Sequence, residues 1–409
     1  MKILVLNSGS SSVKYKFFAA EQEKVLASGI VEKIPSESDP ENLGCLKYKT
    51  AAGDYSKEVK VADHTDAIRI VIEALSDKDN MGVIDDKSDV TAVGHRLVHG
   101  AEEFVESVLI NDRVIDKVRE CFKFAPLHNP PNLKGVEACR KIFGDIPMVG
   151  VFDTAFHQQM PAHAYLYGLP YEMYEEYRIR RYGFHGTSHY FVSERVKELT
   201  KKSKLDSLRV ITCHLGNGSS IAAIRGGKSI DTSMGFTPLE GVAMGTRSGD
   251  LDPAIPLMLQ SEDFGGPREP GEVDTLLNKK SGLLGISGSS NDFRELHDAR
   301  ADGDERAELA VKLFSYKVRK YVGSYMAVLG GLDCLVFTAG VGENDEDVRE
   351  LVCSDMEDLG IILDKEKNLG KKRKAELLST PESKIEVWVI PTDEELVIAR
   401  DTKKIVSKT

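Results

Sequence analysis

Two short turns rich in glycine and serine could bind phosphate, one in each half of the chain. The first lies in ILVLNSGSSSVKY (3–15) and the second in VITCHLGNGSSIAAI (210–224), each between two apolar runs. Glycine lets a ligand approach the backbone closely, while asparagine and serine supply hydrogen-bond donors and oxygens. The first turn is not a Walker loop, because it does not match G-x-x-x-x-G-K-[ST] and strand residues follow it instead of a helix. One such turn could be an ordinary hairpin, but two copies predict a duplicated domain with facing phosphate turns.

A third glycine-rich stretch, LVFTAGVGENDEDVREL (335–351), has the pattern of a strand, a loop and a helix. Gly340 and Gly342 would let a nucleotide lie against the backbone, and the start of the following helix would attract phosphate. Because this stretch follows two phosphate turns along the chain, it predicts a nucleotide site.

Short apolar runs alternate with amphipathic patterns along the whole chain, which is typical of an α/β fold. In open α/β sheets, ligands collect beyond the carboxyl ends of strands, so polar or glycine residues at these ends are candidates for a site. The residues at such ends are Asn7, Arg96, Asp153, Asn217 and Gly340.

Local patterns also predict two helix starts and one excursion. Apolar residues spaced three and four apart within 68–75 predict an amphipathic helix with Thr65 as its cap. Near the end of the sequence, Thr392 and Glu395 have the spacing of a capping box, which gives Glu395 a structural role. Residues 261–274 are rich in turn formers and predict an excursion from the second half.

The composition argues against nucleic acid or a membrane as the main partner. The 409 residues are 41% hydrophobic and 29% charged, and 54 basic against 65 acidic residues leave a net charge of −11. The basic run KEKNLGKKRK (365–374) is therefore interpreted as a solvated helix face. No apolar run reaches the ~18 residues of a membrane span. Met1-Lys2 leads straight into a strand, and six cysteines are scattered without C-x-x-C, so we expect a cytoplasmic protein with reduced thiols.

Two pairs of histidines have the i, i+4 spacing of zinc ligands, His95 with His99 and His185 with His189. The chain has no H-E-x-x-H motif, and Gly186 weakens a helix at the second pair, so zinc is not favoured. His189 is interpreted as a structural residue.

A series of longer motifs is more specific. The chain contains, in this order, NSGSSSVKY, GHRLVHG, FAPLHNP, VFDTAFH, RRYGFHGTSH, HLGNGSS, GTRSGDLDPA, FTAGVGEN and PTDEELVIARDT. Together these motifs resemble those of the acetate kinases, over essentially the whole chain, although the excursion at 261–274 looks longer. The resemblance implies an α/β fold of two duplicated actin-like (ribonuclease H-like) domains, with mixed sheets flanked by helices, closing over ATP. The expected domains are 1–155 plus 396–409, and 156–395 with the nucleotide-binding and dimerisation elements.

The resemblance also implies an activity and a set of site residues. The enzyme would transfer a phosphoryl group reversibly from ATP to acetate, giving acetyl phosphate and ADP for acetyl-CoA biosynthesis, with Mg²⁺ or alternatively Mn²⁺, as a homodimer. Catalytic positions would be Asp153, His185 and Arg247, and metal positions Asn7 and Glu394. Substrate contacts would come from Arg96, Val98, Leu127, His128, Phe184 and Pro238. Nucleotide contacts would come from Ser10, Ser12, Lys14, His214, Leu215, Gly216, Asn217, Gly218, Asp292, Phe293, Arg294, Gly340, Val341, Gly342, Glu343 and Asn344.

The chemistry expected of these residues needs no general base. Acetate is ionised at pH 7 and can attack the γ-phosphorus directly, whereas a sugar hydroxyl would need a base. Catalysis would then rest on positioning and on neutralising charge on the transferring phosphoryl group. Arg96 and Arg247 suit this work because their planar forks hold carboxylate and phosphoryl oxygens, with His185 stabilising an equatorial oxygen. Asp153 would orient Arg96 or a metal-bound water, although capping of the next element is an alternative.

Three other functions remain open at this point. Val98, Leu127, Phe184 and Pro238 correspond to the family's methyl pocket, but an apolar pocket discriminates one methylene by only ~1–3 kcal/mol, so a propionate or butyrate kinase is an alternative. Pyrophosphate could be the donor, although Lys14 and the 340–342 loop favour ATP. An actin-like ATPase of the filament or chaperone type belongs to a different class and would not need the arginines and histidines.

Overall fold

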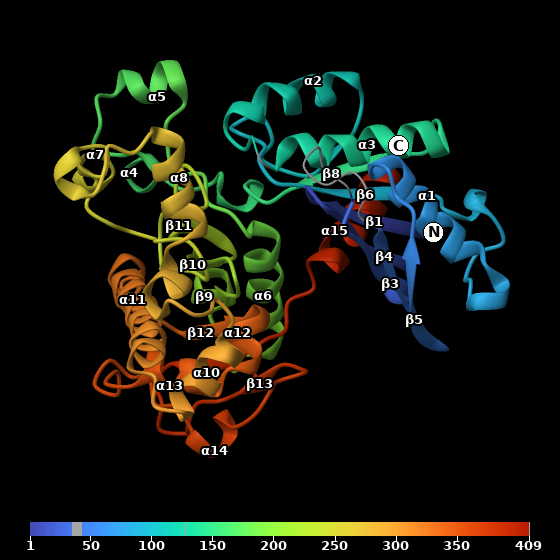
Figure 1. The fold of residues 1–409 in the computed structure, drawn as a ribbon. Coiled ribbons are helices and arrows are strands. Elements are labelled where there is room, and N and C mark those ends of the chain that lie inside the picture. Colours follow the sequence, from blue (N-terminus) through green and yellow to red (C-terminus); the bar gives the residue numbers. More distant parts are fainter. Residues whose placement is uncertain (35–42, 127, 409) are drawn as a thin grey trace. The chain divides into compact units, whose positions relative to one another are not determined.

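The computed structural model describes residues 1–34, 43–126 and 128–408, which form two compact units. Unit 1 contains Met1–Phe156 and Asp393–Thr409, and unit 2 contains His157–Thr392. Each unit has its own mixed sheet flanked by helices (Figure 1). Within the described ranges, none of the helices is long and apolar enough to cross a membrane.

Unit 1 is built on a sheet with the strand order β5-β4-β3-β2-β1-β6-β8-β7. Its strands are β1 (Lys2–Ser8), β2 (Ser12–Ala19), β3 (Lys24–Glu32), β4 (Gly44–Thr50), β5 (Gly53–Val59), β6 (Ala92–Leu97), β7 (Val108–Leu109) and β8 (Met148–Phe152). Its helices are α1 (His64–Ser76), α2 (Asp112–Glu120), α3 (Asn129–Phe143) and α15 (Glu394–Val406). The strands from β1 to β5 pair antiparallel, whereas β1, β6 and β8 run parallel, so the sheet is mixed.

Alternate residues of β1 enter two different cores, one on each face of this sheet. Leu4 and Leu6 pack in the core that contains α1 and α3, while Ile3 and Val5 pack in the core that contains α15. This is the two-residue period of a strand. As a result α15, drawn in red, lies against strands drawn in blue, although its residues come from the far end of the sequence (Figure 1).

The close approach of α15 depends on a glycine in β6. A Cβ atom at Gly94 would come within 2.6 Å of side-chain atoms of Ile398 and Thr402. A larger residue at position 94 would therefore push α15 away from the sheet, together with the residues at the start of that helix.

Unit 2 is built on a sheet with the strand order β11-β10-β9-β12-β14-β13. Its strands are β9 (Arg209–Leu215), β10 (Ser219–Arg225), β11 (Lys228–Thr232), β12 (Cys334–Thr338), β13 (Glu376–Leu377) and β14 (Glu386–Val389). Its helices are α4 (Ala162–Tyr165), α5 (Glu172–Tyr177), α6 (Gly186–Leu199), α7 (Ala254–Met258), α8 (Pro270–Lys279), α9 (Gly282–Ser287), α10 (Phe293–Ala301), α11 (Glu305–Leu329), α12 (Ala339–Asn344), α13 (Glu346–Cys353) and α14 (Lys365–Asn368). Short 3₁₀ turns occur in both units. Those of unit 1 are Lys78–Asn80, Lys87–Asp89 and Cys121–Lys123, those of unit 2 are Leu205–Ser207 and Glu262–Phe264, and Ala155–His157 lies at the boundary.

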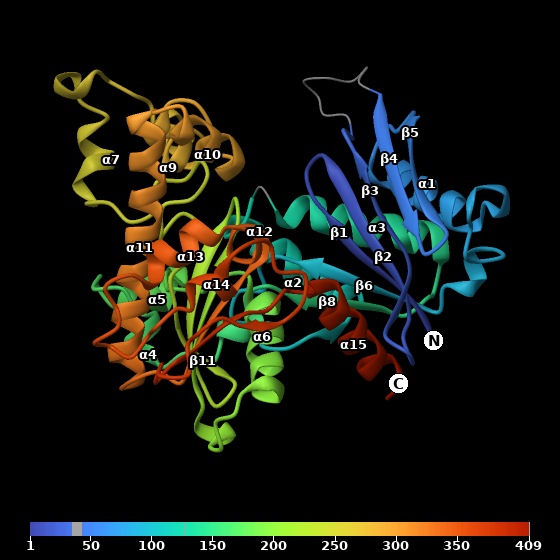
Figure 2. The ribbon, with the colours of Figure 1, turned by 90° about the horizontal axis from the view of Figure 1, so that it is seen from below.

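Helices α6 and α11 cover opposite faces of the unit 2 sheet, as both views show (Figure 1, Figure 2). Ile211 and Cys213 of β9 pack in the core that contains α11. The alternate residues Thr212 and His214 instead hydrogen-bond side chains of α6. The α6 face of this sheet is therefore polar where the α11 face is apolar.

The two sheets share one plan. In each, an antiparallel hairpin (β1–β2 or β9–β10) is extended by a third antiparallel strand on one side (β3 or β11) and by two parallel strands on the other (β6 and β8, or β12 and β14). The hairpin turns are residues 9–11 and 216–218. The predicted fold class, an α/β protein with two mixed sheets flanked by helices, is confirmed.

Both helix caps predicted from the sequence are wrong. The N-cap of α1 is Asp63, whose side chain accepts a hydrogen bond from the backbone N of Asp66 at 2.9 Å, and not Thr65. The N-cap of α15 is Asp393, which accepts from the backbone N of Leu396 at 3.2 Å. An N-cap must have non-helical backbone geometry directly before the first turn, and the aspartates, not the threonines, occupy those positions.

Two stretches also differ from expectation, the predicted loop at Gly340–Asn344 and the basic run 365–374. The predicted loop at Gly340–Asn344 is the helix α12, which begins directly after β12 and buries Gly342 against the backbone of Phe337. The basic run 365–374 is helical only over α14, so most of its cations lie outside a helix. The excursion at 261–274 includes a 3₁₀ turn and the start of α8.

Candidate active site

Unit 1 has a polar edge where β1, β6 and β8 end. Asn7 and Arg96 continue the alternation that places Val5 and Gly94 on the α15 face, and Asp153 follows β8 directly. Because β1, β6 and β8 are parallel neighbours, their carboxyl ends meet at one edge. The predicted residues Asn7, Arg96 and Asp153 therefore share one face and one edge of the sheet.

Arg96 and Asp153 form a two-point ion pair at this edge. Nε of Arg96 donates to Oδ1 of Asp153 at 3.0 Å, and Nη2 donates to Oδ2 at 2.5 Å. The Asp153 residue is 1% exposed, so this carboxylate is buried with its counter-ion. Burial opposes the charge of Arg96, yet Asp153 and Glu394 hold the pKa of Arg96 above its ordinary value. This arrangement is the one expected if Asp153 orients Arg96.

The start of α15 brings a second carboxylate to the same place. Glu394 is the first residue of α15, and its Oε2 lies 3.8 Å from Nε of Arg96. Glu395 instead binds two lysines of β2, with Oε1 2.7 Å from Nζ of Lys14 and Oε2 3.0 Å from Nζ of Lys16. Although burial alone would raise it, these lysines lower the pKa of Glu395 to about 2. Glu395 is thus an ion-pair partner of the predicted phosphate-binding Lys14 and not part of a capping box.

The oxygen atoms on this face fit a magnesium ion. Asn7 pairs with Lys14 across the hairpin, and its carboxamide has no hydrogen-bond partner among the described residues. Mg²⁺ prefers oxygen ligands and is usually bound by one or two carboxylates together with waters and substrate phosphates. Within the described ranges, no group of three or more His, Cys, Asp or Glu side chains could hold a metal ion. Asn7 and Glu394 remain the candidate residues, and Ser10 and Ser12 border the turn beside them.

Two buried asparagines of α3 bind the backbone at Val98 and His99, and His128 directly precedes that helix. Oδ1 of Asn132 accepts from the backbone N of Val98 at 3.0 Å, and Oδ1 of Asn129 accepts from the backbone N of His99 at 3.0 Å. His128 directly precedes α3, which carries both asparagines. Leu127, also predicted to line the substrate pocket, lies outside the described residues.

In unit 2 the second phosphate turn is held to its neighbours by both backbone and side chains. Oγ of Ser219 donates to the carbonyl of Gly216 at 2.9 Å and closes the turn. The backbone carbonyl of Asn217 accepts a hydrogen bond from the backbone N of Gly245 at 3.1 Å. The side-chain Oδ1 of Asn217 accepts a hydrogen bond from Nδ2 of Asn291 at 2.9 Å. The turn therefore connects the loop that carries Arg247 with the start of α10.

His185 lies at the start of α6 in a left-handed conformation, with φ 55°. Its Nδ1 is 2.8 Å from Oγ of Ser220, and its ring stacks on that of His214 with centroids 4.1 Å apart. A Cβ added at Gly218 would lie 3.6 Å from Nε2 of His185 and 3.6 Å from Nη1 of Arg247. The ends of His185 and Arg247 therefore both lie beside the glycine of the turn.

Arg247 has no carboxylate partner among the residues that the structure describes. Its Nη1 reaches only the carbonyl of Pro238 at 3.5 Å and Sδ of Met244 at 3.7 Å. Burial lowers the pKa of Arg247 from its ordinary value. A partly buried arginine of this kind is prepared to bind an anion. Phe184, the neighbour of His185, is itself buried, and Pro238 lies beside the guanidinium.

A cavity of about 740 Å³ in unit 2 brings together much of the predicted nucleotide site. The predicted residues that line it are Gly216, Asn217, Asp292, Phe293, Arg294, Gly340, Val341 and Asn344. Leu215 and Gly342 are instead buried, and Oε1 of Glu343 accepts from the backbone N of Thr392 at 3.2 Å. His214 and Gly218 lie on the His185 side of the turn.

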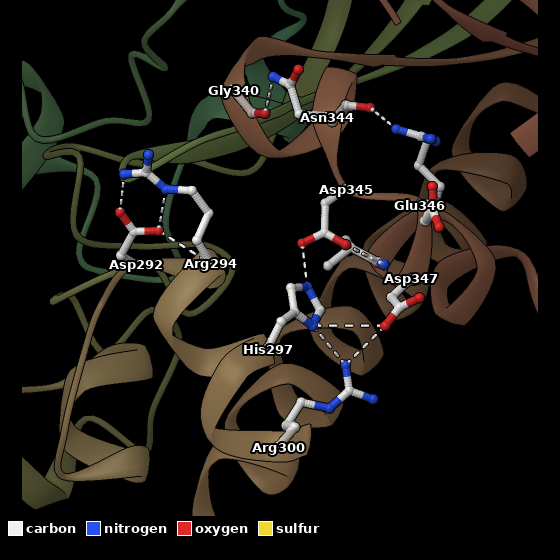
Figure 3. A network of polar contacts seen from close by, with 12 residues as sticks. Asp292, Arg294, His297, Arg300, Gly340, Asn344, Asp345, Glu346 and Asp347 are labelled. Atoms are coloured by element: carbon white, nitrogen blue, oxygen red, sulfur yellow. Dashed lines mark hydrogen bonds and ion pairs between the residues drawn. The ribbon is translucent and has the colours of Figure 1, made fainter. Parts of the chain in front are cut away.

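The walls of this cavity are joined by a network of polar contacts (Figure 3). Nε2 of His297, on α10, lies 2.7 Å from Oδ2 of Asp345, the N-cap of α13. Nη1 of Arg300 lies 2.9 Å from Nδ1 of His297 and 3.1 Å from Oδ2 of Asp347. The hydrogen bond to Asp345 raises the pKa of His297 from its ordinary value. The network fixes the distance between α10 and the start of α13.

Sequence reasoning missed several residues of this cavity. Lys371 and Arg373 line it, although their basic run was interpreted as a solvated helix face. The sequence contained a signal for this: in KNLGKKRK, Gly370 follows the end of α14, so the basic residues 371–374 come after the helix. His297 and Asp345 gave no signal, because their contact depends on how α10 packs.

The chain is similar to known proteins of one family over almost its whole length. A sequence model of the acetokinase family matches residues 2–400. The chain is 54% identical over 411 residues to acetate kinase of Dictyoglomus thermophilum, covering 100% of both chains. It is 55% identical over 408 residues to acetate kinase of Thermoanaerobacter pseudethanolicus, covering 99% of each.

The fold of the chain is also similar to that of solved structures. The crystal structure of Porphyromonas gingivalis acetate kinase matches with a TM-score of 0.92 at 50% identity, over 99% of both chains. A propionate kinase from Francisella tularensis matches with a TM-score of 0.89 at 40% identity, also over 99% of both chains.

Proposed function

The chain belongs to the acetokinase family, and we propose that it is an acetate kinase that catalyses acetate + ATP ⇌ acetyl phosphate + ADP. A carboxylate oxygen of acetate forms a bond to the γ-phosphorus while the bond from that phosphorus to the β,γ-bridging oxygen breaks. The electron pair of the broken bond goes to ADP. No proton is transferred, because acetate is already ionised near neutral pH.

The single observation that carries this proposal is the environment of Arg247. Arg247 is partly buried and has no carboxylate partner in the part of the chain that the structure describes, and its Nη1 lies beside the same glycine as Nε2 of His185. We propose that Arg247 neutralises charge on the transferring phosphoryl group and that His185 donates a hydrogen bond to one of its equatorial oxygens. Both groups would act most strongly when that charge develops, which is what lowers the barrier.

In unit 1 we assign a different part of the work to Arg96. Asp153 takes up Nε and Nη2 of its guanidinium, which fixes the direction of the remaining amino group. Arg96 would bind the carboxylate of acetate in this orientation, and Asp153 would serve as its orienting residue instead of as a general base. Asn7 and Glu394 would hold magnesium, which when bound neutralises charge on the β- and γ-phosphates.

We propose that ATP is the donor and that its adenosine occupies the 740 Å³ cavity between α10 and α12. Phe293 and the backbone at Gly340 would contact the base and ribose, and the turn at Asn217 would contact the phosphates. A pyrophosphate donor would leave this cavity without a function.

A second candidate substrate is propionate, because the propionate kinase from Francisella tularensis is also a close structural match. Val98, Phe184 and Pro238 would contact the methyl group of the acid, and a pocket of this kind discriminates one methylene by only ~1–3 kcal/mol. We therefore expect activity with both acids and a preference for acetate.

One assay tests donor and acceptor together. Hydroxylamine trapping of acyl phosphate is measured with C2, C3 and C4 acids, each with ATP and with pyrophosphate. The proposal predicts acetyl hydroxamate with ATP as the strongest signal, lost in Arg247→Ala. ATP hydrolysis that does not depend on any acid would favour an actin-like ATPase of the filament or chaperone type.

We further propose that the protein acts in the cytoplasm as a homodimer in which unit 2 forms the interface. Leu309 and Tyr316 of α11 are exposed apolar residues that support this assignment. Sedimentation that finds a monomer at micromolar concentration would contradict it.

A further inference from the structure

A row of four side chains leads from the interior of unit 2 to His185. Oγ1 of Thr212, on β9, lies 2.7 Å from Nδ1 of His189, on α6. Nε2 of His189 lies 2.7 Å from Oγ of Ser220, on β10, and this same Oγ lies 2.8 Å from Nδ1 of His185. Thr212, His189 and Ser220 are each 0% exposed, so bulk water does not reach these contacts.

We propose that Thr212, His189 and Ser220 form a hydrogen-bond chain of fixed direction, which holds His185 as the tautomer with its proton on Nε2. This inference rests on the proposed function only for its consequence in catalysis. The direction itself follows from where the hydroxyl hydrogens can go.

The hydroxyl of Thr212 sets the direction of the chain. Within the described part of the protein its Oγ1 has one partner, Nδ1 of His189. If Nδ1 of His189 carried the proton and donated, the hydrogen of Thr212 would be buried without an acceptor, at a cost of about 1–3 kcal/mol. Thr212 therefore donates, and Nδ1 of His189 accepts.

The remaining bonds follow from this first one. A neutral His189 that accepts at Nδ1 carries its proton on Nε2, which donates to Oγ of Ser220. Ser220 then has its own hydrogen left to donate, and among the described residues Nδ1 of His185 is the acceptor that lies within reach of its Oγ. Hence Nδ1 of His185 accepts, and the proton of a neutral His185 is on Nε2.

Two further observations agree with this direction. Burial, together with the neighbouring rings of His157 and His214, holds the pKa of His189 well below its ordinary value, so His189 stays neutral. His157, whose ring packs edge-on against His189, must donate from Nε2 to the carbonyl of Phe184, and its Nδ1 accepts from Ser229. The same tautomer thus recurs in the neighbouring buried histidine.

The consequence concerns the transferring phosphoryl group. Phosphoryl oxygens only accept hydrogen bonds, so His185 helps only if Nε2 carries a hydrogen. Nε2 is the atom that lies beside Gly218 together with Nη1 of Arg247. Thr212, His189 and Ser220 touch no substrate in this account and act as positioning residues for His185.

Thr212 offers a matched pair of variants. Thr212→Val has nearly the same shape but no hydroxyl, whereas Thr212→Ser keeps the hydroxyl and loses a methyl group. If Thr212 only packs, the serine variant should be the more impaired one. The proposal predicts the reverse: Thr212→Val lowers kcat about 3–10-fold with unchanged KM for ATP, as expected for one lost hydrogen bond of about 1 kcal/mol, and Thr212→Ser keeps a kcat near that of the wild type.

The tautomer itself is read by two-bond ¹H–¹⁵N correlation spectra of the wild-type protein labelled at its 10 histidines, with His185→Gln and His189→Gln used only for assignment. We expect both residues with the proton on Nε2. This spectrum does not depend on activity, so it decides the inference even if acyl phosphate is never formed or a variant does not fold. A proton on Nδ1 of His185 or His189, or a Thr212→Val variant with unchanged kcat, would overturn the proposal.

Discussion

Arg96 and Asp153 meet at the ends of two parallel strands through two parallel hydrogen bonds, Nε to Oδ1 and Nη2 to Oδ2. Nη1 of Arg96 has no partner among the described residues, so one corner of the guanidinium is left for a ligand. Arg247 presents the contrasting case of a cation with no acidic partner at all in the described chain. The two arginines should therefore respond differently to mutation.

Arg96→Ala should lower kcat by about 10²-fold or more and raise KM for acetate, because the carboxylate loses its main contact. The variant should also lose about 3 kcal/mol of unfolding free energy, since Asp153 is left buried without its counter-ion. Arg96→Lys should rescue poorly, because an ammonium cannot form both bonds. Arg209 is a suitable control, because it forms a similar two-point ion pair with Asp333. Arg209 is the first residue of β9, so it lies at the end of that strand away from the turn at 216–218. Arg209→Ala should affect unfolding but not kcat.

Arg247→Ala should lower kcat by about 10²-fold or more with little change in unfolding free energy, because it leaves no acid unpaired. Arg268 donates to the backbone carbonyls of Leu259 and Phe264 and has no carboxylate partner among the described residues, so it serves as the control, with Arg268→Ala expected to keep wild-type kcat. Steady-state kinetics and urea unfolding on the same samples separate the two effects. A near-wild-type rate in Arg247→Ala would remove the central role given to this residue.

His185→Ala should lower kcat strongly and leave KM for ATP nearly unchanged, because the hydrogen bond to the phosphoryl group forms mainly in the transition state. His185→Gln keeps an N–H donor and should retain more activity than the alanine variant. His163, an exposed histidine of α4, provides the control His163→Ala. Equal kcat in the Gln and Ala variants would show that hydrogen-bond donation is not what His185 contributes.

Glu395 should stabilise the protein in a pH-dependent way. Its pKa is lowered from 4.5 to about 2, so its ionised form is favoured by folding. This contribution is present in full above the unfolded pKa and is lost as pH falls from about 4.5 toward 2. The difference in unfolding free energy between wild type and Glu395→Gln should therefore shrink over that interval, measured by urea unfolding at several pH values. A difference that does not change with pH would contradict the assignment of Glu395 as the ion-pair partner of Lys14 and Lys16.

Residues at the ends of predicted strands could be placed from the sequence because the apolar runs mark the strands and the sheet brings their ends together. Arg96 and Asp153 are the clearest example. Caps were not predictable, because Asp63 and Thr65 are both good cap residues and only the backbone conformation selects one. Gly340 and Gly342 suggested a loop, but packing of α12 on β12 outweighs the low helix propensity of glycine.

Contacts between elements that are distant in sequence were the least predictable. His297 and Asp345 meet only because α10 packs beside α13, and nothing in either local sequence indicates it. Thr212 lies within an apolar strand pattern and gave no sign of a polar role, and Ser220 was expected at a phosphate turn instead of beside His189. Their function emerges only when α6 places His189 between them.

The most direct test of the account is the pH dependence of kcat for wild type and Asp153→Asn, at saturating magnesium, ATP and acetate. Because acetate arrives ionised, no residue has to accept a proton, and Asp153 serves to orient Arg96. We predict that Asp153→Asn lowers kcat at every pH and that raising the pH does not restore it. A basic limb in the wild-type profile that vanishes in Asp153→Asn, while the rate of the variant climbs in proportion to hydroxide, would show that Asp153 is a general base and would contradict direct transfer without one.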